Sequence, residues 1–85
     1  MKEEFYKWYK IMLDELSKNQ VTLGDLYKIL LQMKEDDLDE DAALSILKEI
    51  RAKEGDALTD VQDDLLLDSM DIVTGHCLPE DKIWK

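Results

Sequence analysis

Two signals for the start of a helix divide this chain and limit its possible folds more than any other feature. Thr22 stands three residues before Asp25, and Thr59 stands three residues before Gln62. At this spacing the two side chains of each pair accept hydrogen bonds from backbone N–H groups that the first helical turn leaves without partners. Apolar residues then recur every three or four positions, so the pattern predicts helices beginning at these two threonines.

The first part of the chain follows the same helical period. Over residues 2–17, one stripe of the predicted helix holds Phe5, Trp8, Tyr9, Met12 and Leu16, with polar side chains on the opposite side. This spacing places the five side chains on one face, where they can be buried together. We therefore expect the first helix to contribute a face of large side chains to a core.

N-cap residues predict where the other three helices begin. The capped segments predict helices over residues 22–34 and 59–74. Between them, Asp39 is a plausible N-cap for a helix over residues 39–54, and Gly55 is the expected left-handed residue that follows it.

The end of the chain carries no helical period. Residues 75–85 include Pro79 and predict an irregular tail, in which Ile83 and Trp84 fold back over an open end of the core. The sequence as a whole predicts an all-α fold, a compact four-helix domain over residues 1–85 with the irregular C-terminal tail packed on the core.

Length and composition favour one domain inside the cell. A chain of 85 residues is long enough for one domain and too short for two. It has no apolar run near the roughly 20 residues that span a bilayer, and its acidic N-terminus does not resemble a signal peptide. The single cysteine, Cys77, cannot form an internal disulfide, which fits a reducing compartment. We expect a cytoplasmic protein.

The charge of the chain is strongly negative and unevenly distributed. The formal net charge is −10, and residues 35–71 alone hold fourteen acidic and three basic side chains. Such a surface repels nucleic acid and anionic membranes and attracts a basic partner. We therefore expect a monomer or weak homodimer that binds a basic protein, and neither nucleic acid nor membrane.

The sharpest pattern lies on the last predicted helix. At about 100° per residue, five aspartates gather on one face, and Leu67 projects into it. Like charges one turn apart are mildly destabilising, and aspartate forms helices less well than glutamate. A solvated face is the simplest interpretation, but a rigid acidic array that matches a basic surface explains the choice of aspartate better.

The predicted binding residues combine this face with the acidic junction before the third helix. They are Asp36, Asp37, Asp39, Glu40, Asp41, Asp60, Asp63, Asp64, Leu67, Asp68 and Asp71.

The junction also resembles the start of an EF-hand calcium loop. Asp37, Asp39 and Asp41 have the alternating spacing of the first ligands. The sixth position should be glycine and is Ala42, and the twelfth should be a bidentate glutamate and is Lys48. A lysine places a cation where the metal needs an anion, so we expect no metal site.

Asp68-Ser69-Met70-Asp71 resembles the attachment site of acyl carrier proteins, in which a serine receives phosphopantetheine. Those proteins are also small, acidic and four-helical, and the resemblance implies Ser69 as a cofactor site. In that family, however, the serine opens the second helix. Ser69 comes late in the last predicted helix and on its apolar face, so we expect a core serine bonded to its own helix and no cofactor.

Catalysis has little support in the sequence. His76 and Cys77 are the only residues of their types, and neighbours on an extended segment point apart. We expect Cys77 to be buried, His76 to cover a helix end, and the protein not to be an enzyme.

Size, acidity, helical makeup and the clusters at residues 35–41 and 60–71 together resemble the small acidic immunity proteins that bacteria pair with secreted nuclease toxins, of the colicin and contact-dependent inhibition types. No family motif is matched, so no residue role is carried over. The resemblance implies a protein that binds and blocks a nuclease toxin domain. The alternatives are an acyl carrier, a phage-type inhibitor that mimics nucleic acid, and a structural subunit with Trp8, Tyr9 or Trp84 in an interface.

Overall fold

The structure, a computed structural model, describes residues 2–18, 20–75 and 83–84. It contains four α-helices, α1 (Lys2–Leu16), α2 (Leu23–Glu35), α3 (Glu40–Glu54) and α4 (Asp60–Thr74), and a short 3₁₀ turn at Gly55–Ala57. No strand occurs among the described residues. The predicted all-α, four-helix fold is confirmed, and each helix begins and ends within one residue of its expected bounds.

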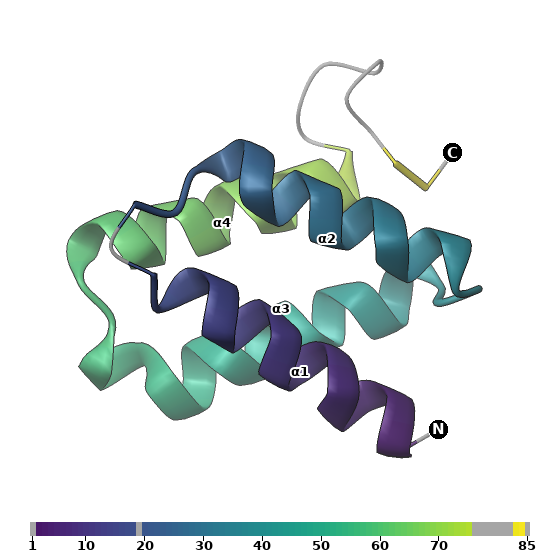
Figure 1. Ribbon diagram of the computed structural model, residues 1–85, viewed down its shortest axis with the longest axis horizontal. Helices are drawn as coiled ribbons and strands as arrows, with labels where there is room; N and C mark the ends of the chain where they lie inside the picture. The colour runs from purple at the N-terminus through teal and green to yellow at the C-terminus, as the bar shows by residue number, and fades with distance from the viewer. Residues whose placement is uncertain (1, 19, 76–82, 85) are drawn as a thin grey trace.

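Each helix packs mainly against two others. Helix α1 contacts α2 and α3, and α4 contacts the same two helices from the other side. Figure 1 shows α1 and α3 running in one direction and α2 and α4 in the opposite direction. Helix α2, which buries four residues, therefore packs between α1 and α4.

Local hydrogen bonds explain where the helices begin. The Thr22 hydroxyl accepts from the Asp25 N–H at 3.3 Å, and the Asp25 carboxylate accepts from the Thr22 N–H at 3.1 Å. Thr59 and Gln62 form the same reciprocal pair at 3.1 and 2.8 Å. Asp39 caps α3 by accepting from a backbone N–H in the first turn at 2.7 Å. All three predicted caps are confirmed, because each depends only on residues three positions apart.

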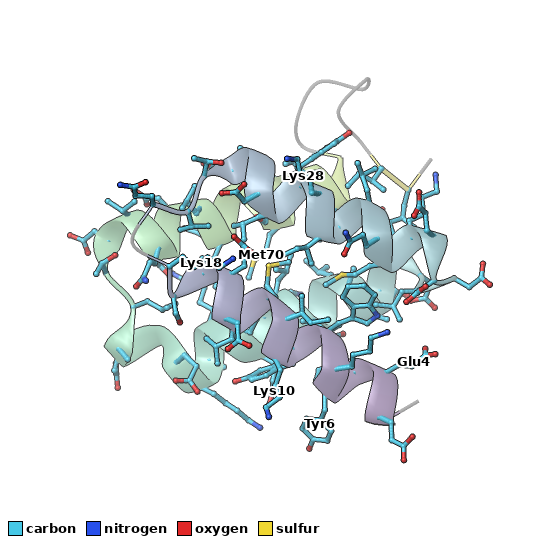
Figure 2. The ribbon with its side chains drawn as sticks, viewed as in Figure 1. Glu4, Tyr6, Lys10, Lys18, Lys28 and Met70 are labelled. Atoms are coloured by element: carbon cyan, nitrogen blue, oxygen red, sulfur yellow. The ribbon has the colours of Figure 1, made fainter. Side chains whose placement is uncertain are left out.

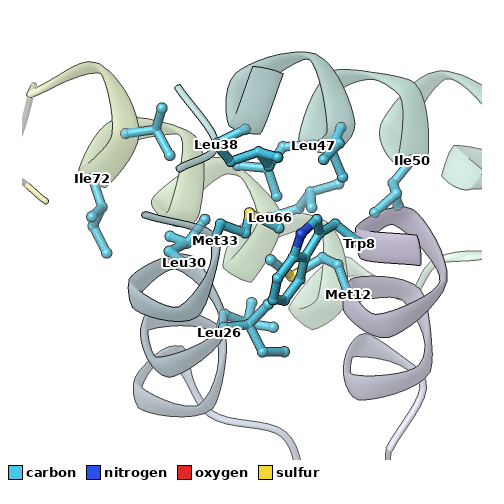
Figure 3. Packing of buried hydrophobic residues seen from close by; sticks show 14 of the residues in the cluster. Trp8, Met12, Leu26, Leu30, Met33, Leu38, Leu47, Ile50, Leu66 and Ile72 are labelled. Carbon is cyan, nitrogen blue, oxygen red and sulfur yellow. The ribbon is translucent and has the colours of Figure 1, made fainter. Parts of the chain in front are cut away.

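The core lies between the four helices, and every helix contributes to it (Figure 3). Burial of these side chains is the main favourable contribution to folding. The fully buried large apolar residues are Met12 and Leu16 from α1, Leu26, Leu30 and Met33 from α2, Ile46, Leu47 and Ile50 from α3, and Leu66 and Val73 from α4.

The end of α3 differs from the prediction. Gly55 has φ −54° and ψ −39°, which is right-handed, and the chain continues into the 3₁₀ turn. The Leu58 N–H bonds to the carbonyls of Glu54 and Gly55, and the partly buried Leu58 packs against the core. The left-handed conformation expected at Gly55 is found at Gly75, the predicted end of α4, and at Asp37.

The C-terminal end of the chain is tied to the end of α2. Ile83 is buried, and its carbonyl accepts a hydrogen bond from the Lys34 ammonium at 2.8 Å. The Trp84 indole N–H donates to the Leu38 carbonyl, also at 2.8 Å. For these two tail residues, the predicted return to the core is confirmed.

The orientation of α4 can be tested with two adjacent leucines. Leu66 is fully buried, whereas Leu67 is 37% exposed. We expect Leu66→Ala to lower the free energy of unfolding by about 2–5 kcal/mol, because it leaves a cavity in the core. Leu67→Ala should lower it by about 1 kcal/mol or less. Urea denaturation of both variants provides the measurement, and equal losses would contradict this orientation of α4.

Candidate functional site

Most of the predicted acidic face of α4 points to solvent. Asp60, Asp64, Asp68 and Asp71 are all exposed, while the opposite side of the helix packs into the core. The four carboxylates follow one another at spacings of three or four residues, so they lie along one side of the helix. The structure thus presents a row of short acidic side chains on a rigid element.

The fifth aspartate of this set has a different role. Asp63 accepts from the Arg51 Nε at 3.0 Å and from its Nη2 at 3.5 Å, which joins α4 to α3. The Asp63 side chain is only 33% exposed. Because Arg51 neutralises much of its charge, Asp63 contributes to helix pairing more than to the acidic face.

The other four aspartates form no ion pair with any cation that the structure describes. The acids that do form ion pairs in the described part of the chain are Glu15, Asp36, Glu49 and Asp63. Four uncompensated carboxylates on one helix repel one another mildly and create a negative potential that attracts a cation.

Two apolar side chains accompany these carboxylates. Leu67 is 37% exposed, which excludes a position wholly inside the core. Val61 is 67% exposed and lies three and seven residues before Asp64 and Asp68, hence on the same side of the helix. The sequence interpretation missed Val61, although the same helical spacing identifies it. We call Asp60, Val61, Asp64, Leu67, Asp68 and Asp71 the α4 face.

The second predicted cluster is the α2–α3 junction at residues 35–41, between the end of α2 and the start of α3. Figure 1 shows the first turn of α4 at the left-hand end of the molecule and the junction at the right-hand end. The molecule measures 32 Å along its longest axis. Helices α3 and α4 run in opposite directions, so their starts are far apart. The last turn of α4, which holds Asp71, lies toward the same end of the molecule as the junction, so the distance between the two clusters is greatest at Asp60 and smallest at Asp71.

The acids of the junction differ in their surroundings. Asp36 pairs with Lys7 at 3.5 Å, and Asp39 is committed to the α3 cap. Asp37 and Asp41 are exposed, while Glu40 is half-buried. The junction is therefore partly structural, and its acids do not form a uniform array like that on α4.

Asp37 has a backbone conformation that the sequence interpretation did not predict. Its φ is 65°, in the left-handed region, and the N–H groups of Asp37 and Leu38 bond to the carbonyls of Lys34 and Met33 at 3.0 Å each. This pair of bonds ends α2 in a Schellman motif, in which the left-handed position is usually glycine. Asp is one of the few other residues that adopt this conformation readily, so the chain keeps a carboxylate at a position where glycine is the common choice.

Ser69 lies on the core side of α4. It is fully buried, and its hydroxyl donates to the Leu65 carbonyl at 2.9 Å. This is the bond to its own helix that the sequence predicted. A prosthetic group could not be attached there without opening the core.

Two further predictions concern other residues. Trp8 is 3% exposed and belongs to the core, so it is not available for an interface in the way the structural-subunit alternative requires. Tyr9 and Trp84 are partly buried. His76 and Cys77 lie outside the described residues. Among residues 2–18, 20–75 and 83–84, no group of three or more His, Cys, Asp or Glu is placed to hold a metal ion.

Comparison of the chain with protein-family models, with curated proteins and with solved structures found no significant match. Within the described part of the chain, every helix is too short or too polar to cross a membrane.

The burial of Ser69 leads to a prediction about modification. Incubation of the folded protein with coenzyme A and a broad-specificity phosphopantetheinyl transferase should leave its mass unchanged, because the hydroxyl is buried and hydrogen-bonded. Intact-mass spectrometry provides the readout, and an acyl carrier protein treated in parallel is the positive control. A stoichiometric adduct on Ser69 would support the carrier alternative instead.

Proposed function

We propose that this protein is an acidic binding module that neutralises a basic, nucleic-acid-directed protein, and that it acts as an immunity protein against a nuclease toxin. The observation that carries the proposal is the α4 face, with its four exposed carboxylates and two exposed apolar side chains. The net charge of −10 adds a long-range field of the same sign.

The carboxylates of the α4 face would speed association with a basic partner and select for it. A nuclease needs a positive surface to hold the phosphate backbone of its substrate. An acidic face attracts such a surface, and complementary charge can raise association rates to about 10⁸–10⁹ M⁻¹s⁻¹ at low salt. A protein bound there would cover the surface that the nuclease uses for its substrate.

The apolar side chains supply the remaining part of the interface. Leu67 is exposed among carboxylates, an arrangement like that of an apolar anchor surrounded by a polar rim. An inhibitor that works only by mimicking nucleic acid would need the charges but not Leu67 and Val61. Their exposure on the same helix therefore favours a protein–protein interface over pure charge mimicry.

The direct test is coexpression of the tagged protein with the product of the adjacent gene. Support requires three results together: a stable complex, a basic partner, and loss of that partner's nuclease activity on addition of the acidic protein. A neighbour that forms no complex, or a complex that cleaves nucleic acid at the full rate, would count against the proposal.

Reversing the charge of the α4 face should weaken binding strongly. In the triple variant Asp60→Lys, Asp64→Lys, Asp68→Lys, we expect the association rate with the basic partner to fall by at least about tenfold at low salt. The matched control is Glu3→Lys, Asp14→Lys, Asp56→Lys, which changes three exposed acids outside the face and has the same net charge. Stopped-flow measurements from low to high salt compare the two, and equal rates for both variants would rule out this face as the interface.

Leu67→Ala should weaken the complex without unfolding the free protein. We expect a loss of about 2 kcal/mol or more in binding free energy, mainly through faster dissociation, because the anchor loses its buried contacts. Leu31→Ala is the matched control, since Leu31 on α2 is exposed to a similar degree, 39% against 37%. Calorimetric titration gives the affinities, and unchanged affinity for Leu67→Ala would show that this leucine is not part of the interface.

A further inference from the structure

A cleft opens between the first turns of α1, the α2–α3 junction and α3. Its volume is about 250 Å³. Both the start of α1 and the junction lie at the right-hand end of the molecule in Figure 1. Its lining consists of Glu4, Phe5, Asp37, Leu38, Asp39, Ala42 and Ile46.

The lining combines an apolar interior with an acidic rim. Leu38 and Ile46 are buried core residues, and Phe5 and Ala42 are partly buried and pack against the core. The three remaining residues, Glu4, Asp37 and Asp39, are exposed acids. Glu4 projects outward from the start of α1 in Figure 2. The cleft therefore has apolar walls and three acidic residues in its lining, two from the junction and one from α1.

This combination favours a particular kind of occupant. A side chain that fills the cleft needs an apolar stem for the walls and a cationic head for the rim. Lysine and arginine both have such stems. Arginine fits better, because its planar guanidinium can stack on the Phe5 ring while it donates to more than one carboxylate.

A second apolar cleft has no such rim. It lies between α2 and α4, has a volume of about 350 Å³ and is lined by Leu23, Gly24, Tyr27 and Ile72. None of these side chains is charged at neutral pH, so this cleft offers nothing that selects a cation. Of these two clefts, only the one beside α1 has acidic residues in its lining.

We propose that the cleft at the α1–junction end is a binding pocket for one arginine side chain of a basic protein. This proposal rests on the proposed function only in taking the arginine to come from the basic partner. The residues that line the pocket do not belong to the α4 face. Asp37 occupies a left-handed position that glycine would fill with less strain. Its carboxylate at the rim is the feature that glycine would remove.

The test uses the whole protein and two capped peptides. The probe is acetyl-Ala-Arg-Ala-amide, and its control contains citrulline, which has the shape of arginine without the charge. In NMR titrations of the ¹⁵N-labelled protein, the arginine peptide should cause saturable shifts at Phe5, Leu38 and Ala42. The citrulline peptide should bind about fivefold or more weakly. No saturable shift at these residues, or equal binding of both peptides, would overturn the proposal.

Variants locate the effect. Asp37→Asn should weaken binding of the arginine peptide about threefold or more, whereas Asp68→Asn on α4 should leave it unchanged. Asp37→Gly suits the left-handed backbone, so it should also lose binding while its melting temperature equals or exceeds that of the wild type. If Asp68→Asn weakens binding as much as Asp37→Asn, the attraction is general to the acidic surface and the pocket is refuted.

The results for the pocket and for the proposed function are separable. The peptide titration requires no toxin and no neighbouring gene, and the charge-reversal test on α4 leaves Glu4, Asp37 and Asp39 intact. If the arginine peptide does not bind but charge reversal on α4 still weakens binding of the basic partner, only the arginine site is refuted.

Discussion

Helix α4 packs between α2 and α3 through Leu66, Ile72 and Val73, and this packing decides which of its side chains face solvent. Burial of each large apolar side chain contributes about 1.5–3 kcal/mol. Repulsion between two carboxylates one turn apart opposes the helix by only about 0.2–0.5 kcal/mol. The core therefore holds the helix in a register that places four like charges together on the outside. The α4 face exists because the apolar side of the same helix is buried.

The ion pair between Arg51 and Asp63 distinguishes one aspartate of α4, which joins two helices, from the four that face solvent. Asp63 lies at the edge of α4 nearest α3, where it meets the guanidinium at 3.0 Å. The Arg51 and Asp63 side chains are 49% and 33% exposed, so the pair stabilises the fold by no more than about 1 kcal/mol. Its greater effect is to remove one charge from the acidic row. Among the described residues, the remaining four aspartates form no ion pair, and they are the acids of the binding face that we propose.

The two acidic regions differ in what they can bind. The α4 face is an exposed strip on one helix, suited to a broad basic surface. The cleft at the other end combines elements from α1, the junction and α3, and its size suits one side chain. An interface of ordinary size buries about 800 Å² on each partner, which a strip along one helix and its surroundings can supply. The proposed arginine pocket therefore has its own chemistry, which does not depend on the α4 face.

Local patterns were enough to predict the helices, their caps and most of their buried faces, because capping and helical periodicity depend on residues three or four positions apart. The same periodicity was enough to predict that Ser69 faces inward and that four aspartates face outward with Leu67.

Helical periodicity could not predict the ion pair of Asp63, since its partner Arg51 stands twelve residues earlier on another helix. Local patterns also mispredicted the backbone conformation of Gly55 at the end of α3, because the chain continues there into a 3₁₀ turn that packs Leu58 on the core. Only the packing of whole helices places the junction at the opposite end from the first turn of α4 and brings Glu4 and Phe5 beside Asp37, since residues 33 positions apart meet only after the core has formed.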